Sequence, residues 1–237
     1  MLIEILLVSL LSAAPAGTKP SAPAPKPAEP TQGSIAPEVK PLVERMQSFY
    51  EKTQDFKASF KQDYKYKTFN RTRTSTGTVL YKKPALMRWE YESPGKTTYV
   101  LTGNKAYIYS VEAESIMVLS LETSKLSPSV SFLLGRGQLA REFNITQGKC
   151  ADCKGALLVL DPVHSDPRFT QVRLEVDSST GQVLKSTVVD PDGAENTISF
   201  LDLKTNVKLK ADSFKLNPPE GTRVDDFNSS DRLYPGP

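Results

Sequence analysis

The feature that most constrains the fold is an alternation of apolar and polar residues that starts just after Asp55. Phe56, Ala58 and Phe60 are separated by single polar residues, and similar runs continue to about residue 204. An apolar side chain at every second position indicates a β-strand with one buried face. Alternation continues to Tyr64 and Tyr66, and the predicted strands that follow are 72–82, 86–92, 97–102, 105–111, 114–120, 142–148, 155–162, 168–177, 182–190 and 195–204.

Turn residues such as Ser93-Pro94-Gly95 and Asp190-Pro191-Asp192-Gly193 separate these strands. Short strands joined by tight turns make an antiparallel meander. Such a sheet must roll into a barrel or a half-barrel to cover its inner face. The sequence therefore predicts a mainly β domain with few helices.

Two segments have the spacing of helices. Between Val39 and Tyr50 the apolar residues recur at three- and four-residue steps, which predicts an amphipathic helix that ends near Gln54. Residues 126–141 predict a second helix, with Pro128 suited to its first turn. Two glycines interrupt its apolar centre, so we expect this helix to be kinked or mobile.

The N-terminal residues indicate export. Residues 5–14 form an apolar run that is too short to span a bilayer, and Ala14-Pro15-Ala16 has the form of a cleavage site, although the preceding residues include no Lys or Arg. We predict a signal peptide at 1–16, a disordered Pro/Ala-rich linker at 17–41 and one folded domain at 42–230.

Composition narrows the range of functions. The chain is 38% hydrophobic and 24% charged, which excludes a wholly disordered chain and a polytopic membrane protein. One histidine and two cysteines leave few groups for catalysis or metal binding. His164 lies near Ser165 and Asp166, but all three belong to one proline-flanked turn, whereas a catalytic triad brings its groups together from different elements. We expect no enzyme activity, no metal and no cofactor.

The pair Cys150 and Cys153 allows three interpretations. A thioredoxin-like site needs the first cysteine at a helix N-terminus, whereas this pair lies between two predicted strands. A zinc site needs four ligands, which two cysteines and one distant histidine do not provide. In an exported protein a disulfide across a hairpin loop is favoured.

Positive charge is concentrated in the N-terminal half. Residues 42–150 carry 17 Lys and Arg against 10 Asp and Glu. We expect a docking surface for an acidic partner or for anionic headgroups. Binding to nucleic acid is ranked last, because export removes the protein from it. The densest basic group is Lys61, Lys65, Lys67, Arg71, Arg73, Lys82 and Lys83.

The predicted inner face is rich in Tyr, Trp and Met, which suit the lining of a cavity for a flexible apolar ligand as well as a dry core. The sequence alone leaves the two possibilities equally open. The candidate lining residues on the strands are Val79, Tyr81, Met87, Trp89, Tyr91, Tyr99, Leu101, Tyr107, Tyr109, Met117 and Leu119. Phe132 and Leu133, in the second predicted helix, complete this set.

Several segments in this order resemble the LolA family, the periplasmic carriers of outer-membrane lipoproteins. The resemblance covers most of residues 40–227, and it rests on order and spacing more than on any one motif. The matching pieces are Phe56 to Gln62, Gly77 to Pro84 followed by Met87-Arg88-Trp89, Leu101-Thr102-Gly103 with Tyr107-Ile108-Tyr109, Pro128 to Ile145, and Phe214 to Asp226.

The resemblance implies an unclosed antiparallel β-barrel with a helical lid over a hydrophobic cavity. In that family the cavity takes the acyl chains of lipoproteins from an inner-membrane ABC transporter and passes them to an outer-membrane receptor. The family often has an arginine that ties the lid to the barrel where this chain has Lys83. Because lysine lacks the planar guanidinium fork, we expect a looser or differently made lid latch.

The leading hypothesis is thus a monomeric periplasmic carrier of acylated lipoproteins. Each buried methylene contributes about 0.8 kcal/mol, so an acyl chain does not cross water without a cavity to hold it. The alternative is a sensor on the same fold, which retains a lipid or lipoprotein and signals through contacts. A carrier hands its ligand to a receptor, and a sensor does not.

Overall fold

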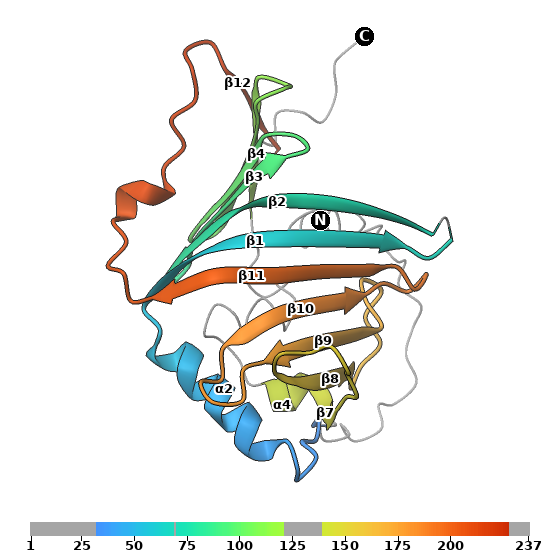
Figure 1. Ribbon diagram of the computed structural model, residues 1–237. Helices are drawn as coiled ribbons and strands as arrows, with labels where there is room; N and C mark the ends of the chain where they lie inside the picture. Colours follow the sequence, from blue (N-terminus) through green and yellow to red (C-terminus); the bar gives the residue numbers. More distant parts are fainter. Residues whose placement is uncertain (1–31, 69, 121–138, 228–237) are drawn as a thin grey trace, which may run out of the picture.

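The computed structural model describes residues 32–68, 70–120 and 139–227. It contains a twelve-stranded sheet in the order β12-β6-β5-β4-β3-β2-β1-β11-β10-β9-β8-β7 (Figure 1). The first six strands are β1 (Asp55–Tyr66), β2 (Arg71–Lys82), β3 (Leu86–Ser93), β4 (Thr97–Thr102), β5 (Lys105–Ser110) and β6 (Ser115–Ser120). The other six are β7 (Phe143–Gln147), β8 (Ala156–Pro162), β9 (Gln171–Val176), β10 (Val183–Val189), β11 (Glu195–Thr205) and β12 (Arg223–Asp226).

The sheet curls but does not close, because its two end strands, β12 and β7, do not pair with each other. All neighbouring strands are antiparallel except β6 and β12, which are parallel. The predicted unclosed barrel is therefore confirmed. The predicted signal peptide 1–16 and residues 121–138 of the insertion, including Phe132 and Leu133, lie outside the described residues.

The predicted first helix is present as α2 (Lys40–Lys52). Its buried residues are Leu42, Val43, Met46 and Tyr50. They pack against the inner face of β7 to β10 in one apolar cluster with residues such as Leu158 and Val172. The β7–β10 end of the curled sheet is thus covered by α2, which lies at the lower left in Figure 1.

The folded part begins earlier than residue 42. Ile35 pairs with Ile145 of β7, and the Ser34 hydroxyl donates a hydrogen bond to Asn144 Oδ1 over 2.8 Å. Val39 is only 3% exposed. The composition of residues 33–41 predicts a linker, but the free edge of β7 gives their backbone a hydrogen-bonding partner.

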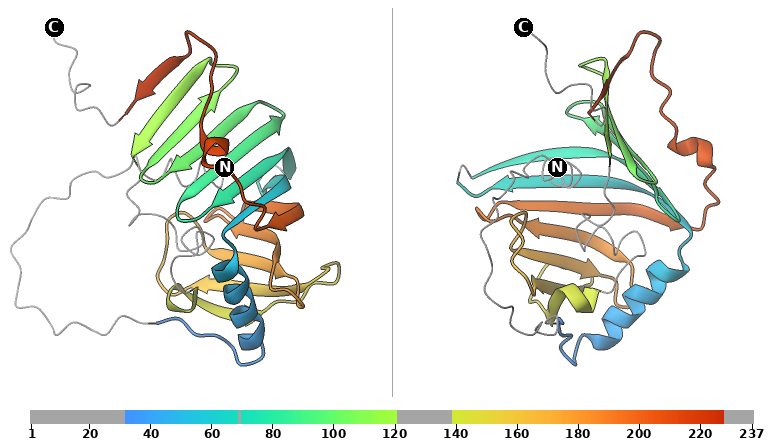
Figure 2. Two further views of the ribbon diagram at one scale, coloured as in Figure 1. Left: turned by 90° about the vertical axis from the view of Figure 1, so that its left-hand side faces the viewer. Right: turned by 180° about the vertical axis from the view of Figure 1, so that it is seen from behind.

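The segment between β11 and β12, residues 206–222, forms a strap over the outer face of β3 and β4, as the left view of Figure 2 shows. The strap contains a short 3-10 helix, η2 (Ala211–Phe214), whose Phe214 is buried, and Arg88 of β3 donates to the Lys215 carbonyl oxygen over 2.7 Å. The strap leads into β12, which the sequence pattern does not predict. With Val224 as its one apolar residue, β12 has no alternation of its own and depends on pairing with β6.

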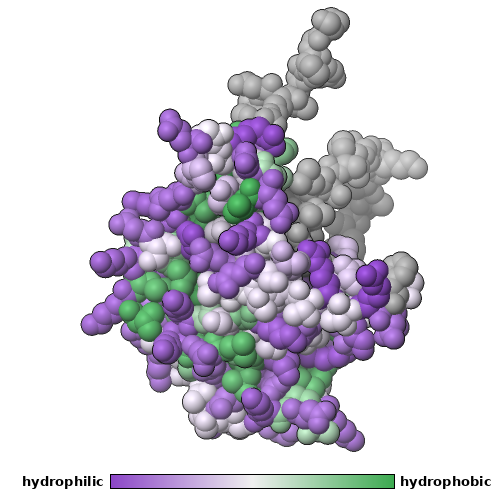
Figure 3. Space-filling view, turned by 45° about the horizontal axis from the view of Figure 1, so that its top comes forward, coloured by the Kyte–Doolittle hydropathy of each residue, from purple (hydrophilic) through white to green (hydrophobic). Residues whose placement is uncertain are grey.

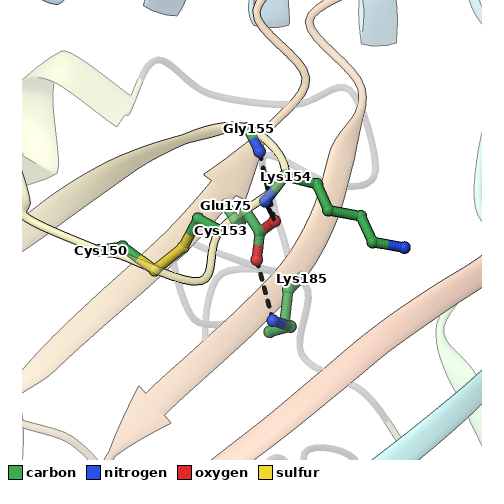
Figure 4. The surroundings of a disulfide bond; sticks show 6 residues. All are labelled: Cys150, Cys153, Lys154, Gly155, Glu175 and Lys185. Carbon is green, nitrogen blue, oxygen red and sulfur yellow. Dashed lines mark hydrogen bonds and ion pairs between the residues drawn. A yellow bond between two sulfur atoms is a disulfide. The ribbon is translucent and has the colours of Figure 1, made fainter.

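The hairpin loop between β7 and β8 carries the disulfide between Cys150 and Cys153, whose Cα atoms are 5.5 Å apart. Close to it, the buried carboxylate of Glu175 accepts hydrogen bonds from the backbone N–H groups of Lys154 (2.7 Å) and Gly155 (3.3 Å). Its second oxygen lies 2.9 Å from Lys185 Nζ (Figure 4). The disulfide and this carboxylate together fix the loop. Of the three interpretations of the cysteine pair, the structure contains the disulfide across the hairpin loop.

Candidate functional site

The inner face of β1 to β6 carries a continuous apolar cluster. In an antiparallel sheet, residues directly opposite each other project from the same face. Trp89 lies opposite both Val79 and Tyr99, and Met87 lies opposite both Tyr81 and Leu101. Leu119 joins them on β6 through Ala106. The structure thus brings seven of the predicted lining residues together as buried members of one cluster, with Tyr91 packed against it.

The centre of this cluster is a group of aromatic rings. The ring centroid of Phe60 lies 4.9 Å from that of Trp89 and 5.0 Å from that of Tyr91, both in edge-to-face geometry. Gly77, opposite both Phe60 and Tyr91, leaves the space that the Phe60 ring occupies, since a Cβ there would meet that ring and the Glu90 carbonyl. The glycine in β2 therefore has a packing role.

Tyr107 and Tyr109 do not belong to this face, contrary to prediction. The turn between β4 and β5 pairs Thr102 with Lys105, so Tyr99 faces Ile108 and Val100 faces Tyr107. An odd-numbered residue of β4 is thus opposite an even-numbered residue of β5. Alternation alone defines two faces for each strand, and only the pairing register decides which face joins the neighbouring strand's inner face.

Met117 is on the inner face, opposite Ile108 on β5. Its side chain is 39% exposed, in contrast to the 9% of Leu119 two residues later. The inner face is therefore buried over β1 to β4 and becomes accessible towards β6.

A chain of buried polar groups lies at the boundary between this cluster and the one under α2. Tyr91 donates its hydroxyl proton to Gln62 Oε1 over 2.8 Å, and Gln62 Nε2 donates to Asn196 Oδ1 over 2.8 Å. Gln62 is 4% exposed and Asn196 is fully buried. Sequence analysis did not select Gln62 or Asn196, although a polar residue at an inward position of an alternating strand was a usable signal.

A pocket of about 170 Å³ opens beside this polar chain. Gln62, Tyr64, Tyr91 and Tyr99 form its inner wall, and Arg73 and Glu112 are among the residues of its rim. The inner face thus changes from apolar to polar and then to charged over a short distance.

Tyr64 and Asp190 form a second polar contact at the same end of the sheet. The Tyr64 hydroxyl donates to Asp190 Oδ2 over 2.7 Å. Burial raises the pKa of the Tyr64 phenol, and the adjacent Asp190 carboxylate adds to that rise. Burial also raises the pKa of Asp190. The hydrogen bond runs from the phenol of Tyr64 to the carboxyl group of Asp190.

Lys83, the predicted lid latch, contacts α2. Its Nζ donates to the carbonyl oxygens of Tyr50 (3.1 Å) and Glu51 (2.7 Å) in the last turn of the helix. The last carbonyl oxygens of a helix generally lack N–H partners further along the helix, and a cation there also meets the negative end of the helix dipole. Residues 121–138, which the latch would hold, lie outside the described residues, so the latch role stays a prediction.

The predicted basic group does not form one surface. Lys61 and Lys65 project from the outer face of β1, with Asp63 between them at 2.9 Å from Lys61, whereas Arg73 projects from the inner face of β2. Lys82 lies 3.8 Å from the buried carboxylate of Asp55 at the other end of the sheet. The seven basic residues therefore do not combine into the single docking surface that the sequence suggests, and Lys61 and Lys82 each lie close to a carboxylate.

The turn that contains His164 is held by an ion pair between Asp166 and Arg168. Both carboxylate oxygens of Asp166 accept hydrogen bonds from the Arg168 guanidinium. Within the described ranges, no three His, Cys, Asp or Glu side chains gather as a metal site would require. No helix among those residues is long and apolar enough to cross a membrane.

Most of the chain matches one known protein family. The profile described as "Outer membrane lipoprotein carrier protein LolA" matches residues 51–217. The chain belongs to the LolA family. Two LolA-family relatives, each named outer-membrane lipoprotein carrier protein, come from Nitrosomonas europaea and Legionella pneumophila strain Lens. The first is 26% identical over 77% of this chain and 87% of its own length, and the second is 28% identical over 77% and 88%.

Among solved structures, an uncharacterized conserved protein from Thermus thermophilus superposes with a TM-score of 0.53. The two chains are 12% identical, and the match covers 80% of this chain and 99% of the other. At this identity the likeness concerns the fold alone, and it agrees with the open, curled sheet described above.

Proposed function

We propose that this protein is a periplasmic carrier that binds the acyl chains of lipoproteins on the inner face of its half-barrel and ferries them from the inner to the outer membrane. The observation that carries the proposal is the continuous aromatic and aliphatic inner face of an open sheet, in a member of a family named for carrying lipoproteins. An apolar surface folded inward shields hydrocarbon from water without any covalent step.

The accessible part of the inner face indicates where a chain enters. Met117 is exposed at 39% on β6, whereas the aromatic residues deeper in the sheet are buried. Methionine is flexible and polarisable, so it adapts to an acyl chain of variable shape. We place the entrance at the β5–β6 end of the inner face.

The proposed partners are an inner-membrane ABC transporter, which supplies the cargo, and an outer-membrane receptor, which accepts it. A monomer is sufficient for both steps. On the face shown in Figure 3, hydrophobic residues form separate patches among hydrophilic ones, a pattern that fits a carrier making transient contacts with more than one partner.

The proposal is tested by exporting the protein with its own leader, purifying it without detergent and identifying bound acylated lipoprotein by mass spectrometry. Met117→Glu places a carboxylate on the inner face and is expected to lower the recovered cargo by about tenfold or more, since an unpaired charge against hydrocarbon is costly. Val111→Glu is the matched control, because Val111 lies in the β5–β6 turn and is similarly exposed at 43%.

Two results would contradict the proposal. One is the consistent absence of acylated cargo from the wild-type protein, and the other is equal recovery from both variants. A transfer assay separates the carrier from the sensor, because a carrier gives labelled lipoprotein to the receptor whereas a sensor keeps it.

A further inference from the structure

Asn196 has a buried amide group that the protein leaves partly unsatisfied. Its Oδ1 accepts from Gln62, but its Nδ2 is buried and has no hydrogen-bond partner among the described residues. A buried donor without an acceptor costs about 1–3 kcal/mol. Buried polar groups of this kind are uncommon in folded proteins and call for an explanation.

The position of Asn196 suggests that explanation. The residue lies opposite Tyr64 across the β1–β11 pair, so its side chain is on the inner face. The two residues it accompanies there, Gln62 and Tyr64, both line the pocket of about 170 Å³. Asn196 is fully buried and does not itself line the pocket, but its hydrogen-bond partner Gln62 does, so Asn196 lies one side chain behind the pocket wall.

The order of surfaces on the inner face, apolar then polar then charged, matches the order of groups in an acylated lipid. The cluster around Trp89 has the apolar character of an acyl chain, and the rim with Arg73 and Glu112 has the charged character of a peptide or headgroup portion. Ester and amide carbonyls lie between these two parts of such a ligand. A carbonyl oxygen is an acceptor, which an amide N–H donor requires.

We propose that Asn196 Nδ2 donates a hydrogen bond to an ester or amide carbonyl of the bound cargo. Gln62 holds the Asn196 amide in place through its own bond to Oδ1, and Tyr91 holds Gln62. The contact fixes how deeply the acyl chains enter, because it places the linkage at the boundary between the apolar cluster and the polar pocket. This inference rests on the proposed function, since it concerns the same inner face.

The test compares two synthetic lipopeptides with equal chain lengths, one with ester-linked hexadecanoyl chains and the other with ether-linked hexadecyl chains that have no ester carbonyl. Trp89 is the single tryptophan of the chain and lies in the inner face, so its fluorescence reports binding. The wild-type protein is expected to bind the ester form about threefold to tenfold more tightly, the effect of one neutral hydrogen bond.

Asn196→Leu is expected to abolish this preference by weakening only the ester form. Gln62→Leu combined with Asn196→Leu removes both amides and leaves neither unpaired, so it gives the same test if the single variant is unstable. Thr197→Val is the control, because Thr197 is the next residue of β11 and its hydroxyl contacts Thr187, a residue of the outer face. It is expected to keep the preference.

Equal binding of the two lipopeptides to the wild-type protein, or a preference that survives in Asn196→Leu, would overturn the inference while leaving the carrier function in place. If neither lipopeptide binds the wild-type protein, the proposed function itself fails, and the inference fails with it.

Discussion

The contact between Lys83 and α2 predicts a specific loss of stability in Lys83→Met. Methionine keeps most of the apolar stem but removes the ammonium group and its two hydrogen bonds to Tyr50 and Glu51. Hydrogen bonds from charged donors contribute about 1.5–3 kcal/mol each when buried. One of these bonds is exposed and the other is partly buried, so solvent reduces the sum.

We therefore expect the free energy of unfolding to fall by about 1–2 kcal/mol in total. For a domain of this size, each kcal/mol lowers Tm by roughly 2–4 °C, which gives a fall of about 2–8 °C. Thermal unfolding followed by circular dichroism measures it. Hydrogen exchange is expected to speed up first at the last turn of α2, whose carbonyls lose their partner.

Lys57→Met is the matched control for this experiment, since Lys57 is an exposed lysine on the outer face of β1. If Lys83→Met unfolds at the same temperature as Lys57→Met, the contact with α2 does not stabilise the fold. A Lys83→Met variant that instead keeps its Tm and changes only the rate of cargo release would favour the lid-latch role.

Three further predictions concern the supports of the sheet. Burial opposes ionisation of Glu175, but its bonds to Lys185, Lys154 and Gly155 outweigh burial and lower its pKa. Glu175→Gln is therefore expected to cost about 1.5–3 kcal/mol at pH 7 in urea denaturation, and the difference from wild type should vanish as pH falls through the lowered pKa; a constant difference would contradict this. Phe214→Ala should cost about 3–5 kcal/mol and open the strap to proteolysis; unchanged cleavage would refute the role of the strap. Replacing both Cys150 and Cys153 by Ser should cost about 2 kcal/mol for so short a loop, with an unchanged Tm as the opposing result.

The inner face was only partly predictable from the sequence. Val79, Trp89 and Tyr99 were found because period-two alternation marks them as inward-facing, and pairing across β2, β3 and β4 keeps them in one row. Gln62 and Asn196 each place a polar side chain at an inward position of a strand, but this local signal does not show that the two residues contact each other. They are brought together by pairing between β1 and β11, over 130 residues apart in the chain.

The sequence by itself determined the class of fold. The alternation, the turn residues and the amphipathic spacing of residues 39–54 are local patterns, and local patterns are enough to predict strands, one helix and an antiparallel meander. The resemblance to the LolA family added the unclosed form of the barrel.

The tertiary structure decided everything that depends on a distant partner. The register of the β4–β5 hairpin placed Tyr107 on the outer face, β6 gave β12 its hydrogen bonds, and the edge of β7 drew residues 33–41 into the fold. Lys83 contacts the end of α2 through a hydrogen bond to a residue 33 positions earlier in the chain. A chain segment fixes its own periodicity, but the free energy that selects its partner comes from backbone and side-chain groups elsewhere in the sheet.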